Sequence, residues 1–191
     1  MRVIVTAAAA VLLAAAGSTA AQASPGDLEG WVGCVAEAQK LSSDGTPTSP
    51  PKEPVCYDTW QEYASASQSS SAILVARGWD YTNFGGSFID FVVSSDCPDV
   101  TVPYPSIGWG WAYIGSTWDN RISSMRVYAN ANTKCTSATM HSQRNWTGDA
   151  HVCVLECSTL GDMNNRTTSL GVDAVPWPLG NVPPPVQGAS R

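Results

Sequence analysis

The sequence has little of what catalysis and nucleic-acid binding require. It contains two histidines, and sixteen aspartates and glutamates outnumber its ten lysines and arginines, which gives a formal net charge of −6. An acidic chain without a basic run repels a phosphate backbone, so nucleic-acid binding is not expected. The motifs of serine hydrolases, zinc proteases and phosphate-binding loops are also absent. We therefore expect no enzymatic activity, and paired carboxylates among Asp90, Asp96 and Asp99 are the remaining catalytic alternative.

Long apolar runs are absent as well, apart from one near the first residue. Arg2 is followed by an apolar stretch from Val3 to Ala16 and then by Ala21-Gln22-Ala23, a small-x-small cleavage pattern. The stretch is well short of the roughly 20 residues that a membrane-spanning helix needs. The pattern predicts a signal peptide over residues 1–23, and hence a secreted, extracellular protein that interacts with no membrane.

Cysteines are few but even in number. All six lie in the part expected to be exported, which favours three disulfide bonds. Cys34 and Cys56 bracket a proline-rich loop, and we expect this pair first, because closing about 22 residues contributes roughly 3 kcal/mol. The sequence leaves the pairing of the other four open. No two cysteines have the spacing of a zinc knuckle, so metal–thiolate chemistry is not expected. The six are Cys34, Cys56, Cys97, Cys135, Cys153 and Cys157.

Composition divides the exported chain into three parts. Residues 24–71 are expected to form a small appendage. It should contain a short helix from Trp60 to about Ser67, which begins at the capping box Thr59-Trp-Gln-Glu62. Residues 72–175 hold short β-branched and aromatic runs separated by turn residues, which is typical of an antiparallel sandwich. Residues 176–191 form a proline-rich tail that is expected to be extended. The runs are Ile73 to Ala76, Phe88 to Val93, Ser124 to Tyr128 and Ala150 to Leu155.

An internal repeat is the most informative feature of the sequence. The octamers Trp79-Asp-Tyr-Thr-Asn-Phe-Gly-Gly86 and His141-Ser-Gln-Arg-Asn-Trp-Thr-Gly148 share the Asn, the aromatic residue after it and the closing Gly. This pattern predicts a folded β-hairpin, because an aromatic ring can cover the bend and glycine adopts positive φ without a steric penalty. His141 stands where the first octamer has Trp79, which favours a packing role.

Each octamer is followed by a second repeated element. Asp119-Asn-Arg-Ile-Ser-Ser124 and Asn164-Asn-Arg-Thr-Thr-Ser169 both read Asp/Asn, Asp/Asn, any, any, Ser/Thr, Ser. Side-chain and carbonyl oxygens of this kind suit Ca²⁺, and two copies predict two sites related by a pseudo-twofold axis. The alternative is that each hexamer is an Asx- or Ser-stabilised turn, a role that holds with or without a metal. The second copy is expected to be weaker, because Asn164 and Asn165 carry no charge.

These paired motifs resemble those of the βγ-crystallin superfamily, and Trp118 is similar to the Trp that commonly precedes the family's calcium stretch. The resemblance implies an all-β, two-sheet Greek-key sandwich, here with a small disulfide-bonded N-terminal appendage. It also implies two Ca²⁺ ions held between two motifs that exchange hairpin elements. Carried over by position, the side-chain ligands are Asp119, Asn120, Ser123, Asn164, Asn165 and Thr168, with the carbonyls of Arg121 and Arg166.

Other functions remain open beside calcium binding. A bacterial metalloproteinase inhibitor and killer-toxin-like antimicrobials share the implied fold, so inhibition of an extracellular protease or killing of cells is an alternative. The segment from Cys97 to Gly110 is the candidate inhibitory loop. Trp109 and Trp111 could stack on a cell-wall sugar or other carbohydrate, or on a partner protein, but we favour a role in capping the core.

Overall fold

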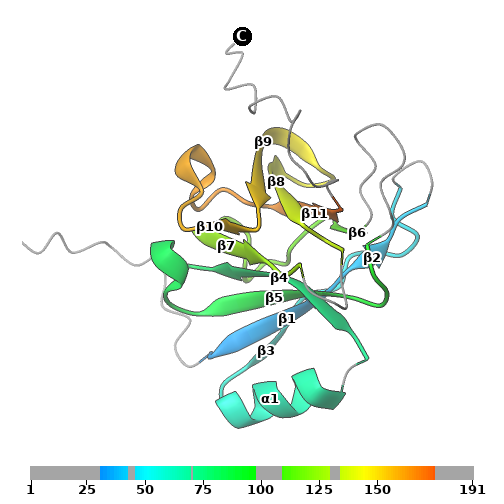
Figure 1. Cartoon of the computed structure of the whole chain (residues 1–191), viewed down its shortest axis with the longest axis vertical. Coiled ribbons are helices and arrows are strands. Elements are labelled where there is room, and N and C mark those ends of the chain that lie inside the picture. Colours follow the sequence, from blue (N-terminus) through cyan, green and yellow to red (C-terminus); the bar gives the residue numbers. More distant parts are fainter. Residues whose placement is uncertain (1–30, 43–45, 70, 98–108, 130–133, 175–191) are drawn as a thin grey trace, which may run out of the picture.

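A computed structural model describes residues 31–42, 46–69, 71–97, 109–129 and 134–174. Two β-sheets pack face to face, and one α-helix lies outside them (Figure 1). The first sheet has the strand order β10-β7-β4-β5-β1-β3 and the second β2-β6-β11-β8-β9. Among the described residues, no helix has the length and apolarity to cross a bilayer. The expected signal peptide and the tail 176–191 lie outside the described residues.

The elements follow one another along the chain in this order: β1 Gly33–Glu37, β2 Gln39–Lys40, β3 Val55–Tyr57, α1 Trp60–Ser69, β4 Ile73–Trp79, η1 Thr82–Phe84, β5 Phe88–Val93, β6 Trp109–Trp111, β7 Ser124–Val127, β8 Ser137–Gln143, β9 Thr147–Val154, β10 Glu156–Cys157, η2 Gly161–Met163 and β11 Ser169–Asp173.

The chain forms two Greek-key halves that each place one strand in the other's sheet. In the first half, hairpin β4–β5 and strand β7 lie in the first sheet, whereas β6 pairs with β11 of the second sheet. In the second half, β8, β9 and β11 lie in the second sheet, whereas β10 pairs with β7 of the first. This reciprocal exchange confirms the predicted two-sheet sandwich.

Strand alternation builds the core between the sheets. In β5, Ile89, Phe91 and Val93 point into the main core, while Phe88 belongs to a second cluster on the outer face of the sheet. Trp111 is buried in the main core and meets Phe91 edge to face, with the ring centroids 4.9 Å apart. Trp109 is buried as well, so the pair fills the core, as expected, and is not exposed for stacking on a sugar.

The segment expected to be an appendage is partly built into the sandwich. Strand β1 pairs in parallel with β5, β3 pairs antiparallel with β1, and β2 pairs with β6 in the second sheet. Cys34 and Ala36 of β1 are buried in the main core, which explains the difference from the prediction. Strands β1, β2 and β3 thus extend both sheets, and among the described elements of this segment α1 stands outside, against β3 and β1.

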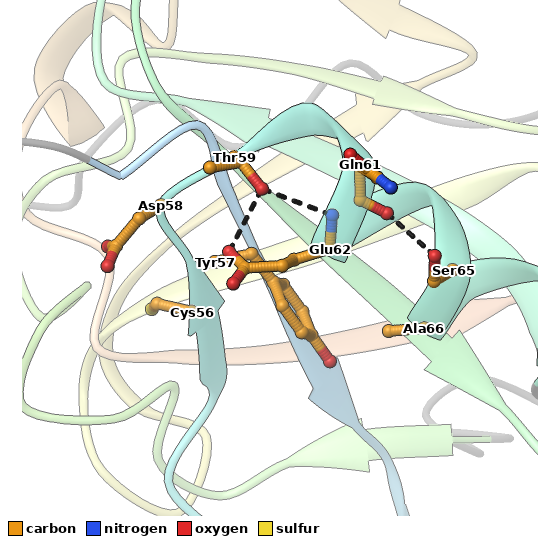
Figure 2. A pocket seen from close by; sticks show the side chains of 8 residues that line it. All are labelled: Cys56, Tyr57, Asp58, Thr59, Gln61, Glu62, Ser65 and Ala66. Carbon is orange, nitrogen blue, oxygen red and sulfur yellow. Dashed lines mark hydrogen bonds between the residues drawn. The ribbon is translucent and has the colours of Figure 1, made fainter.

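Helix α1 begins where the sequence predicts. The amide of Glu62 donates to Thr59 Oγ1 (3.2 Å), and that hydroxyl donates to the Glu62 carboxylate (3.0 Å). Figure 2 shows these two bonds together with the bond from the Ser65 hydroxyl to the Gln61 carbonyl. The carboxylate therefore meets the capping hydroxyl instead of the Thr59 amide, so only half of the expected capping box forms.

Three disulfides account for all six cysteines. Cys34–Cys56 joins β1 to β3, as predicted, and the other pairs are Cys97–Cys135 and Cys153–Cys157. No free thiol remains for a zinc site.

The two octamers form the predicted hairpins, and their geometry repeats closely. Gly86 and Gly148 have φ of 80° and 81°, and the aromatic residues Phe84 and Trp146 also adopt positive φ. A β-carbon on Gly86 would lie 1.9 Å from Asp80 Oδ1, so this position excludes any larger residue.

Replacing this glycine should destabilise the fold measurably. We expect Gly86→Ala to lower the free energy of unfolding by about 3 kcal/mol, because the cost of a left-handed backbone at alanine adds to the cost of the clash with Asp80. Gly161→Ala is the matched control: φ is +54°, but nothing lies within 4 Å of the added carbon, so we expect a loss of only about 1 kcal/mol. Chemical denaturation measures both, and equal losses would contradict the role of the clash.

Candidate metal site

The two hexamers lie against each other across the pseudo-twofold axis. The second residue of each, Asn120 and Asn165, has positive φ (60° and 54°). The amide of Asn120 donates to the Thr167 carbonyl (2.9 Å), and the amide of Asn165 donates to the Ile122 carbonyl (3.0 Å). Asparagine tolerates this left-handed conformation better than most residues, which accounts for its recurrence at both positions. The halves are thereby held in a reciprocal register.

The last serine of each hexamer fastens its own hairpin. Ser124 Oγ donates to the Tyr81 carbonyl (2.6 Å) and accepts from the Phe84 amide (3.0 Å). Ser169 Oγ makes the same two contacts at 2.6 and 3.0 Å, with the Gln143 carbonyl and the Trp146 amide. This turn-stabilising role links octamer and hexamer within each half, and it explains why the two motifs occur together.

A group of oxygens gathers around the fifth residue of the first hexamer. Ser123 Oγ lies 2.8 Å from the Asp80 carbonyl and 2.9 Å from Asn165 Oδ1, and Ser123 is 3 % exposed. Asp80 is the second residue of the first octamer, and sequence reasoning did not assign this hairpin carbonyl. The position of Asp80 directly after the strand that ends in Trp79 was the signal that could have found it.

A second group forms around the fifth residue of the second hexamer. Thr168 Oγ1 donates to Asp119 Oδ1 over 2.7 Å, and Thr168 is 6 % exposed. The Thr168 amide donates to the His141 carbonyl (2.8 Å), as the Ser123 amide does to the Trp79 carbonyl (2.7 Å). Each group thus combines the fifth residue of one hexamer with a side chain of the other hexamer.

An ion pair lies beside the first group. Arg121 Nη2 is 3.2 Å from Asp80 Oδ2, and both side chains are largely buried. Burial raises the pKa of the Asp80 carboxyl, and the charge of Arg121 partly opposes that rise. Asp80 Oδ1 and Arg121 Nε are buried without a hydrogen-bond partner. The carboxylate of Asp80 is therefore engaged with a cation at one oxygen and unsatisfied at the other.

The remaining predicted ligands are exposed side chains and backbone carbonyls. The side chains of Asn120 and Asn164 are exposed, and neither is brought into the two oxygen groups by a hydrogen bond. Arg166 is exposed and pairs with Asp149 (2.5 Å). The carbonyls of Arg121 and Arg166 accept no hydrogen bond within the described part of the chain, which leaves their oxygens available.

The donor set is rich in neutral oxygen and poor in classical metal-binding groups. Over the described ranges, no three His, Cys, Asp or Glu side chains come together as a metal cluster. Hydroxyl, amide, carboxylate and carbonyl oxygens suit a hard cation such as Ca²⁺ and not a soft metal. Burial lowers the pKa of His141, but among the described residues no group of three His, Cys, Asp or Glu side chains includes it.

Two of the three candidate catalytic carboxylates, Asp90 and Asp96, bind other groups of the protein. Asp90 pairs with Arg77, whereas Asp96 Oδ1 accepts from the amides of Cys97 (2.7 Å) and Lys134 (2.5 Å). Asp99 lies outside the described residues, as does most of the candidate inhibitory segment from Cys97 to Gly110.

Comparison with known proteins finds matches among solved structures. No protein-family model and no curated protein matches the chain. Among solved structures, the N-terminal domain of protein S aligns over 53 % of this chain and 98 % of its own, at 22 % identity and a TM-score of 0.36. A βγ-crystallin from an archaeon aligns over 52 % of this chain and 96 % of its own, at 18 % identity and a TM-score of 0.35. A βγ-crystallin domain from Flavobacterium johnsoniae aligns over 56 % of this chain and 99 % of its own, at 18 % identity and a TM-score of 0.34. Two of these three similar structures are named as βγ-crystallins.

Proposed function

We propose that this chain is a secreted, non-enzymatic calcium-binding protein with two Ca²⁺ sites between its halves. One observation carries the proposal. Oxygen atoms of both halves converge at Ser123, because its hydroxyl lies 2.8 Å from the Asp80 carbonyl and 2.9 Å from Asn165 Oδ1 of the second hexamer. A hard cation held among such oxygens would join the two halves.

The proposed ligands come from both halves at each site. The first site uses Ser123 Oγ, the Asp80 carbonyl and the amide oxygen of Asn165. The second uses Thr168 Oγ1 and the Asp119 carboxylate. The carbonyls of Arg121 and Arg166 are available to complete the two shells, and Asn120 and Asn164 stay predicted ligands with exposed side chains.

The exchange between halves changes the expected order of affinity. The uncharged second hexamer predicts a weaker second site, but its Thr168 lies against the carboxylate of Asp119. The neutral Asn165 lies against Ser123, and the nearby Asp80 carboxylate is paired with Arg121. Since ligand charge is a main determinant of calcium affinity, we propose that the site around Thr168 is the tighter one.

Calcium should stabilise the native protein. A ligand that binds only the folded state adds about 2.7 kcal/mol to the free energy of unfolding at one hundred times its Kd. We expect the melting temperature of the mature chain to rise with added Ca²⁺ and to fall again with EDTA. Isothermal titration should resolve two events of unequal affinity. No heat and no shift of the melting temperature at millimolar Ca²⁺ would remove the proposal.

Two substitutions should separate the sites. Asp119→Asn is expected to weaken the tighter event by about tenfold, because a carboxylate ligand becomes a neutral amide. Ser123→Ala is expected to weaken the other event, and Ser65→Ala, an exposed hydroxyl on α1 that donates to the Gln61 carbonyl, should change neither. Melting curves in EDTA verify that each variant is folded. A loss of the weaker event in Asp119→Asn would reverse the proposed order.

Export should leave a defined first residue. Three disulfides suit an oxidising compartment, and the pattern around Ala21-Gln22-Ala23 places cleavage before Ser24. Expression in a secreting bacterial host is expected to release protein that begins at Ser24 into the medium, as N-terminal sequencing would detect. Retention of the full-length chain in the cell would contradict this part of the proposal.

A further inference from the structure

A cavity of about 660 Å³ lies between α1, β3 and the outer face of the first sheet. Its volume falls within the roughly 300–1,000 Å³ of small-molecule sites. The walls are mostly apolar, with Leu74, Val92 and Val35 from the sheet and Ala66 from the helix. Nothing in the calcium proposal uses this cavity.

The inner end of the cavity is polar but electrically balanced. The Asp90 carboxylate is almost fully buried, and Arg77 binds it through Nε to Oδ1 (2.5 Å) and Nη2 to Oδ2 (2.8 Å). The Tyr63 hydroxyl donates to the same carboxylate. Burial and the neighbouring Asp90 raise the pKa of Tyr63, so its hydroxyl stays protonated. Since Arg77 cancels the charge of Asp90, this end adds no net charge.

The opening carries one carboxylate without a cation. Glu37 is paired with Lys52, whose Nζ lies 2.7 Å away, so these two charges cancel. Glu53 also lines the cavity, and its carboxylate accepts only from the amide (2.9 Å) and the hydroxyl (3.3 Å) of Ser116 among the described residues. These bonds fix the carboxylate in place and leave its negative charge uncompensated.

Aromatic rings complete the lining. Tyr57 and Tyr63 both border the cavity and meet edge to face, with centroids 6.2 Å apart. Tyr63 also packs against Phe88, so the two rings add apolar area at the inner end of the cavity. An uncompensated carboxylate at the opening and apolar walls behind it together match a molecule with a positive head and a hydrocarbon tail.

We propose that this cavity binds an alkylammonium compound. The ammonium group lies near Glu53 at the opening, and the tail extends along Val92 and Leu74. The chemistry requires a positive head and does not distinguish a primary from a quaternary amine, which the choice of probes separates. The protein is acidic overall, which favours the approach of a cationic ligand.

Four probes of equal chain length test the proposal: octylammonium, octyltrimethylammonium, octanol and octanoate. Titrations of the full mature chain in EDTA, below the micelle-forming concentration, make the result independent of the proposed calcium sites. We expect both ammonium probes to bind and to change tyrosine and tryptophan fluorescence, octanol to bind more weakly, and octanoate not to bind. Equal binding of octanol, or no binding of either ammonium probe, would overturn it.

Two variants locate the site. Glu53→Gln keeps the acceptor for Ser116 and removes the charge, so octylammonium affinity should fall by about fivefold, the upper range for an exposed charge pair. Ala66→Leu fills the cavity from α1 with a residue of high helix propensity and should abolish binding. The control is Glu156→Gln on β10, an exposed glutamate that pairs with Arg126 of β7, and it should leave the affinity unchanged. Unchanged affinity in both Glu53→Gln and Ala66→Leu, with melting temperatures near that of the parent chain, would place any binding elsewhere.

Discussion

The reciprocal backbone pairing of the two hexamers is the constraint on which the rest of the structure depends. The amides of Asn120 and Asn165 each donate to a carbonyl of the opposite hexamer. This exchange fixes the distance between the halves at the point where Ser123 and Thr168 project. A cation is not needed to explain this register, but the register explains why oxygens from both halves converge.

Local chemistry made much of this arrangement predictable. A glycine with positive φ, an aromatic residue at a bend and a serine that bonds its own turn are features of single segments, so the hairpins around Gly86 and Gly148 follow from the sequence. The helix that begins after Thr59 is local in the same sense. The Cys34–Cys56 bond was predictable because the two residues flank one loop.

Features that depend on distant segments were not predictable. The parallel pairing of β1 with β5 joins residues more than fifty positions apart, and no pattern within Gly33–Glu37 specifies that partner. For the same reason, the sequence does not reveal that the carboxylate of Asp119 meets Thr168 of the other hexamer. The contact of the Asp80 carbonyl with Ser123 also needs the hairpin and the hexamer to be positioned together. Charge counting along one segment cannot reveal such exchanges.

The short N-terminal strands have a mechanical consequence. Within eight residues the chain joins the first sheet through β1 and the second through β2, and the Cys34–Cys56 bond anchors β3 to the same place. The two sheets are therefore connected along one border by the continuous backbone of β1 and β2, in addition to the strands exchanged between the halves. The two sheets cannot separate along that border while β1 and β2 both remain paired. They can separate there only after β1 or β2 has been peeled away, which couples loosening at this border to loss of the whole sandwich.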